Sequence, residues 1–131
     1  MEDISHILVN DTLGMDTYEY IVNHAEGDDE NLPVLIEHLR KIDRTGQFLA
    51  STARFLHAVD RERYDQYLET LVGTAIDRDR ERKYIGSLLQ ALWGEDYEER
   101  AEELQAQDDN FRRIYKRLYP SKSSGNFGNL I

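Results

Sequence analysis

The sequence predicts an all-α protein of six or seven helices, stacked as antiparallel hairpins in a bundle or a short solenoid. Apolar residues recur three and four positions apart through most of the chain, which is the spacing of one helix face. Residue types that begin and end helices separate these segments. The chain has 131 residues, of which 40% are hydrophobic, and a chain of this size folds around one hydrophobic core. We therefore expect a single helical domain over residues 1–120, followed by a flexible tail over 121–131.

The N-terminal third contains the first two of seven proposed helices, preceded by a short apolar run. The run 4–9 fits a strand or a helix, and the helix is favoured because a lone strand would have no partner. The first proposed helix is expected over about 16–26, with Asp16 as its N-cap and Gly27 just after its end. The second begins at Asn31 as N-cap, with a proline in its first turn, where the missing N–H costs no hydrogen bond.

The middle of the chain has the broadest apolar stripes. A helix over about 47–59 is expected to be central, and Asp60 is expected to cap a further helix, whose stripe has the clearest helical period. That stripe comprises Tyr64, Tyr67, Leu68, Leu71, Val72, Ala75 and Ile76. A fifth helix is expected to follow the charged stretch 77–83 and to end at Gly94.

Two shorter helices are predicted towards the C-terminus. Asp96 is expected to cap a sixth helix with a thin apolar stripe, which places this helix at the edge of the domain. A seventh helix over 109–119 is expected to end at Pro120, which cannot continue a helix. Shifting the sequence by 33 residues also aligns 55–71 with 88–104 at six identical positions. This alignment suggests a repeated helix pair, but it leaves a chance match open.

The charge of the chain favours basic partners. Twenty-six acidic and sixteen basic residues give a net charge of −10, which disfavours direct binding to nucleic acid or to an anionic membrane. The acidic excess is concentrated in the first third of the chain, around one expected loop. We expect a partner-binding patch there, formed by Glu26, Asp28, Asp29 and Glu30, although general solubility explains the same acids without any partner.

The helix expected over 109–119 runs against this acidic trend. Arg112, Arg113, Lys116 and Arg117 alternate there with aromatic residues, a composition that some nucleic-acid and acidic-peptide contacts share. The favoured interpretation is that these cations complement the helix dipole and pair with acids of the preceding helix.

The sequence shows no catalytic or cofactor-binding motif. It has no cysteine, so thiolate metal sites and cysteine nucleophiles are excluded. Glu-x-x-His pairs, a Gly-x-Ser-x-Gly turn and a glycine loop before a helix are missing as well. His24, close to acids of the expected loop, is the candidate for a metal-dependent site, and a solvated acidic loop explains it more simply. We therefore expect neither an enzyme nor a bound cofactor.

By elimination, the sequence indicates a non-catalytic protein-interaction module. It is expected in the cytoplasm, because no stretch is long and apolar enough for a membrane span. A rival hypothesis is a small acidic inhibitor or nucleic-acid mimic, of viral or mobile-element type, that occupies a basic groove of a nucleic-acid-handling protein.

The tail carries three further candidate binding residues, Phe127, Leu130 and Ile131. Its other residues are mostly small and polar, which disfavours independent folding. The three apolar residues are expected to dock on a partner or on a neighbouring molecule, so a homo-oligomer stays open. A chain end that carries three apolar residues by chance is the alternative.

Overall fold

The computed structural model describes residues 3–24 and 30–120, and it confirms the all-α prediction. In these residues it contains seven helices and no strand. Their bounds are α1 Ser5–Asn10, α2 Met15–His24, α3 Leu32–Ile42, α4 Gln47–Arg78, α5 Gly86–Trp93, α6 Ala101–Gln107 and α7 Asp109–Leu118. None of these seven helices is both long enough and apolar enough to cross a membrane.

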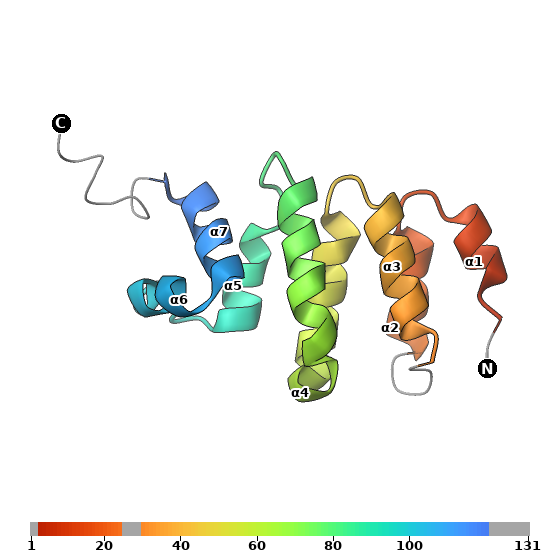
Figure 1. Ribbon diagram of the computed structural model, residues 1–131, viewed down its shortest axis with the longest axis horizontal. Helices are drawn as coiled ribbons and strands as arrows, with labels where there is room; N and C mark the ends of the chain where they lie inside the picture. The colour runs from red at the N-terminus through yellow and green to blue at the C-terminus, as the bar shows by residue number, and fades with distance from the viewer. Residues whose placement is uncertain (1–2, 25–29, 121–131) are drawn as a thin grey trace.

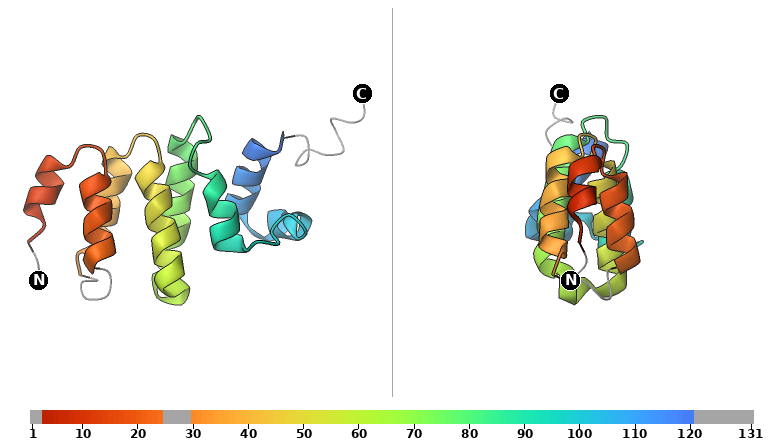
Figure 2. Two further views of the ribbon diagram at one scale, coloured as in Figure 1. Left: turned by 180° about the vertical axis from the view of Figure 1, so that it is seen from behind. Right: turned by 90° about the vertical axis from the view of Figure 1, so that its right-hand side faces the viewer.

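The helical hairpins stand side by side in a single row, with α1 at one end and α6 and α7 at the other (Figure 1). An end-on view shows how narrow this row is (Figure 2). α2 and α3 form one antiparallel hairpin, and the two halves of α4 form the next. The main contacts join neighbours along the row: α1 with α2, α2 and α3 with α4, and α4 with α5 and α7. The architecture is therefore a short solenoid of stacked hairpins.

Asp60 divides α4 into its two halves, as the sequence predicts. The backbone of Asp60 is extended rather than helical, with φ −165° and ψ 90°. Its carboxylate accepts the backbone N–H of Arg63 at 3.1 Å, which is the geometry of an N-cap. In the second half of the helix, Leu68 and Leu71 are both buried. The predicted apolar stripe therefore faces the core.

Each connection between one hairpin and the next, called a corner below, is built around a buried aspartate. The corner between α3 and α4 shows the pattern most completely. One carboxylate oxygen of Asp43 accepts the N–H groups of Thr45 and Gly46 at 3.2 and 3.0 Å. The other oxygen accepts those of Phe48 and Leu49 at 2.9 and 2.8 Å. A single side chain thus accepts hydrogen bonds from the backbone N–H groups of the corner and of the first turn of α4. The N–H groups of that first turn have no acceptor within the helix.

Asp11 and Asp79 play the same part at the corners before α2 and α5. Asp11 accepts the backbone N–H and the hydroxyl of Thr17 at 2.8 and 2.6 Å. Burial alone would raise the pKa of Asp11, but the hydrogen bonds from Thr17 and from the corner N–H groups outweigh it and hold this pKa below its usual value. Asp79 accepts the N–H groups of Tyr84 and Ile85 at 2.7 and 2.8 Å.

The spacing between successive corners along the chain is not constant. Asp43 follows Asp11 by 32 residues, and Asp79 follows Asp43 by 36, so the corners do not keep the fixed 33-residue shift. Arginines join successive corners: Arg78 donates to the carbonyl oxygen of Asp43 at 2.8 Å, and Arg117 donates to that of Asp79 at 2.9 Å. The second and third corners are therefore held partly by the hairpin that follows each of them.

The third residue after each corner aspartate has a positive φ. Gly14 and Gly46 occupy this position in the first two corners, with φ +113° and +84°. Arg82 occupies it in the third corner, with φ +59°. This conformation is disfavoured for a residue with a Cβ atom. The third corner therefore carries a local strain that the other two avoid.

We expect Arg82→Gly to be more stable than Arg82→Ala by about 0.5–1 kcal/mol, because only glycine relieves this strain. Both variants lose the hydrogen bond from Arg82 to the Arg117 carbonyl, so the comparison isolates the backbone. Urea unfolding of the two proteins measures the difference. The same pair of substitutions at Lys83 is the control, since its φ is not positive, and there alanine should be the more stable. An equal stability of the two Arg82 variants would contradict the assignment of strain.

Two predicted helix starts are wrong. Asp16 is not the N-cap of the helix predicted over 16–26, because α2 begins at Met15. The carboxylate that accepts an N–H of its first turn, that of Thr17, belongs to Asp11. Asp96 does not cap the sixth helix, because α6 begins at Ala101 and residues 95–100 form turns. Arg100 holds these turns by pairing with Asp96 at 3.3 Å.

Candidate functional site

Exposed acidic residues gather along the edge of the row opposite the corners, where the hairpins turn. We call this surface the acidic edge. It contains Glu30, Asp60, Glu62, Asp65, Glu95, Asp96, Glu98, Glu99, Glu102 and Glu103, all exposed. Figure 1 shows the turn of α4 and the segment from α5 to α6 at this lower edge. Arg61, Arg63 and Arg100 are the basic residues of the same segments, so carboxylates predominate there.

Only one of the partner-binding residues expected from the sequence lies in the described part of the chain. Glu30 is exposed and lies just before α3, on the acidic edge. Glu26, Asp28 and Asp29 lie outside the described residues, and so do the three apolar residues of the tail. The turn between α5 and α6, which was not among the expected binding residues, adds further exposed acids to the acidic edge.

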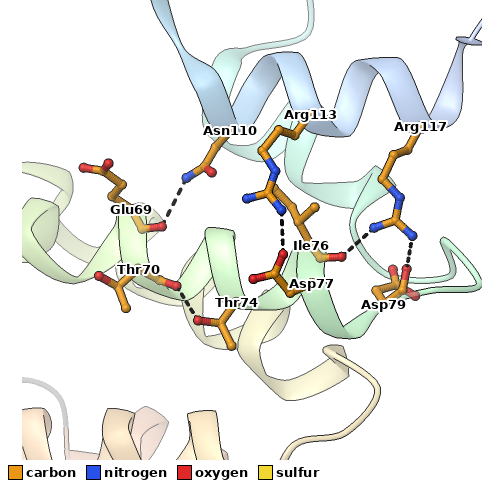
Figure 3. Close-up of polar contacts among 9 residues, drawn as sticks. All are labelled: Glu69, Thr70, Thr74, Ile76, Asp77, Asp79, Asn110, Arg113 and Arg117. Carbon is orange, nitrogen blue, oxygen red and sulfur yellow. Dashed lines mark hydrogen bonds and ion pairs between the residues drawn. The ribbon is translucent and has the colours of Figure 1, made fainter.

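The basic residues of α7 are used largely within the fold. Arg113 pairs with Asp77 of α4 at 2.5 Å, and Arg117 donates to the carbonyl oxygens of Ile76 and Asp79 at the end of α4 (Figure 3). Arg112 pairs with an acid of its own helix. All three arginines therefore make contacts within the fold, but the expected pairing with acids of the preceding helix is wrong for them. Their partners lie in α4 and α7 rather than in the preceding helix.

The histidines lie apart from one another in the described part of the chain, and the acids expected near His24 at positions 26, 28 and 29 lie outside it. Nδ1 of His24 lies 2.9 Å from the carbonyl oxygen of Tyr20, and the two rings stack at 3.9 Å. Across residues 3–24 and 30–120, no group of three or more potential ligands is placed to hold a metal ion. His57 is half-buried, and burial, followed by the nearby charge of Arg61, lowers the pKa of its imidazole. Both effects favour the neutral imidazole of His57.

A cleft of about 330 Å³ opens between α4 and the helices that follow it. We call it the α4–α7 cleft. It is lined by His57, Arg61, Asp65, Leu68, Glu69, Val72, Leu92, Trp93, Gln107, Asp108, Asp109 and Asn110. A second hollow, which shares Arg61, Trp93 and Asp108, extends it towards α6. Its walls come from segments up to about fifty residues apart, so no spacing in the sequence relates them.

Trp93 is held rigidly in the wall of this cleft. Its indole Nε1 donates to Asp108 at 3.1 Å, and its ring meets that of Phe111 edge to face, with centroids 5.3 Å apart. Asp108 also accepts the N–H of Phe111 at 3.1 Å as the N-cap of α7. The indole is therefore fixed by contacts on two sides before any ligand arrives. A fixed aromatic ring can bind a ligand at low entropic cost.

The charged side chains beside Trp93 are free to meet a ligand. Asp65 and Glu69 lie four residues apart on α4, so both are on one face of the helix. In the part of the chain that the structure describes, neither carboxylate makes a hydrogen bond or an ion pair. Leu68 and Val72, whose side chains are buried, line the cleft from the same face of the helix. The cleft thus combines a fixed indole, an apolar floor and open carboxylates.

Trp93 is the only tryptophan of the chain and ends α5 just before Gly94. It was the sequence feature available for finding this region, but it was not among the expected binding residues. Comparison of the chain with protein-family models, with curated proteins and with solved structures gives no match.

Proposed function

We propose that the protein is a non-catalytic protein-interaction module of the cytoplasm, and that its acidic edge binds a partner with a basic surface. The observation that supports this proposal is the gathering of exposed carboxylates from successive hairpins on one edge. Such a row repels itself. Asp60 caps the second half of α4, but the aspartates that hold the corners lie on the opposite edge, so capping does not explain the rest of the row. A stack of helical hairpins also offers an extended surface to a partner.

The partner is best identified by co-purification from the native host. Its binding is then compared between the wild type and the triple variant Glu95→Gln, Glu99→Gln and Glu102→Gln. We expect the variant to bind about tenfold more weakly at low salt, mainly through slower association, and the difference to shrink as salt is added. The three side chains are exposed, so the fold should be unchanged.

A matched control removes three negative charges elsewhere, by Asp16→Asn, Glu37→Gln and Glu81→Gln, which are exposed and lie off the acidic edge. This control should bind nearly as the wild type does. Equal affinity of the two triple variants would show that net charge, and not the acidic edge, governs binding. If DNA or RNA competes with this protein for binding to the partner, the rival hypothesis of an acidic inhibitor or nucleic-acid mimic is favoured.

A further inference from the structure

We infer that the α4–α7 cleft receives an arginine side chain of the basic partner. This inference rests on the proposed function, since it names the group that the partner inserts. The cleft opens beside the acidic edge, and Asp65 belongs to both surfaces. A partner drawn to the acidic edge by its charge is therefore brought to the mouth of the cleft.

The charge of the cleft selects a cation. Asp65, Glu69 and Asp108 line it together with one arginine, Arg61. Asp109 is already paired with Arg112. The excess of carboxylates repels an acidic side chain of a partner. An apolar side chain would leave the oxygens of Asp65 and Glu69 without a hydrogen-bond partner.

The shape of the cleft favours arginine over lysine. The aliphatic stem of a basic side chain can lie on the apolar floor of Leu68, Val72 and Leu92. A guanidinium group is planar and weakly hydrated, so it can stack against the fixed Trp93 indole while it donates two parallel hydrogen bonds to a carboxylate. The ammonium group of lysine is a compact, strongly hydrated point charge and cannot make both contacts equally well.

Trp93 is the only tryptophan, so its fluorescence reports on the cleft directly. The probes are three ten-residue peptides that alternate glycine with arginine, with lysine or with citrulline, which has the shape of arginine without its charge. We expect the arginine peptide to change the Trp93 emission saturably, and the lysine peptide to need a concentration about threefold or more higher. The citrulline peptide should cause no saturable change.

The double variant Asp65→Asn and Glu69→Gln should raise the half-saturating concentration of the arginine peptide about fivefold or more, as expected for the loss of charge-assisted hydrogen bonds. The control variant Glu99→Gln and Glu102→Gln also loses two acids, but they lie outside the cleft, and it should change this value less than about twofold. Thermal unfolding of both variants shows whether the fold is kept.

The outcomes separate this inference from the proposed function. If calorimetry shows that the arginine peptide binds while Trp93 emission is unchanged, or if both double variants bind equally, the cleft is not the arginine site and the acidic edge can still be the docking surface. Equal responses to arginine and lysine would overturn the choice of arginine. If the native partner is insensitive to the loss of acids on the edge, the proposed function fails whatever the peptides do.

Discussion

Replacing Asp43 by alanine should lower the free energy of unfolding by about 3–5 kcal/mol. The substitution leaves four backbone N–H groups without their acceptor, two in the corner and two in the first turn of α4. Gly46 and Leu49 are buried, so water cannot replace the carboxylate there, and each unsatisfied buried donor costs about 1–3 kcal/mol. Urea unfolding followed by circular dichroism measures the loss.

Asp65→Ala is the control for this effect, because it also removes an aspartate from the α4 region, but an exposed one whose carboxylate makes no hydrogen bond or ion pair within the described fold. It should change the stability by less than about 0.5 kcal/mol. Asp43→Asn should fall between the two, since one amide oxygen can accept part of the same hydrogen bonds. A loss below about 1 kcal/mol for Asp43→Ala would show that the corner does not depend on this carboxylate.

Leu71→Ala should destabilise the protein by about 2–5 kcal/mol, the range for emptying a well-packed core position. The side chain of Leu71 is 0% exposed, and it lies in the second half of α4, the helix that contacts neighbours on both sides in the row. Because α4 is packed on both sides, the helices around it have little freedom to move in and close the cavity that the substitution leaves. Thermal and urea unfolding both report the change.

Leu13→Ala makes the same chemical change at a position that is 71% exposed, and it should cost less than about 0.5 kcal/mol. The contrast between the two leucines tests whether the second half of α4 faces the core. A loss below about 0.5 kcal/mol at Leu71 would mean that this half of the helix is turned the other way.

Features that depend on neighbouring residues were predictable from the sequence. The period of the apolar stripe gives the buried face of each helix, and Asp60 is recognisable as an N-cap because the residues that it serves follow it directly. The wrong prediction for Asp16 has the same origin, because Asp16 lies at the position where a cap from a neighbouring residue is expected. The true acceptor, Asp11, serves Thr17 from six residues away. The Asp-x-x-Gly pattern shared by Asp11 and Asp43 was the available signal.

The candidate site could not be predicted in the same way. His57, Trp93 and Asp108 are contributed by α4, by α5 and by the residue that caps α7, and no spacing in the sequence relates them. These residues come together because the second half of α4 packs against α7. The contacts of Arg113 and Arg117 with the end of α4 hold that packing in place. Charge composition predicted an acidic surface, but only the hairpin geometry shows which acids share an edge.

The single row of hairpins has a consequence for how the chain reaches this structure. Every main contact joins a helix to its neighbours along the row, so few contacts require distant parts of the chain to find each other, and the entropy lost in closing loops is small. Folding can begin at an interior hairpin and spread towards both ends by adding one hairpin at a time. α4 is the natural starting point, because both of its halves and the Asp60 turn that joins them are consecutive in the sequence.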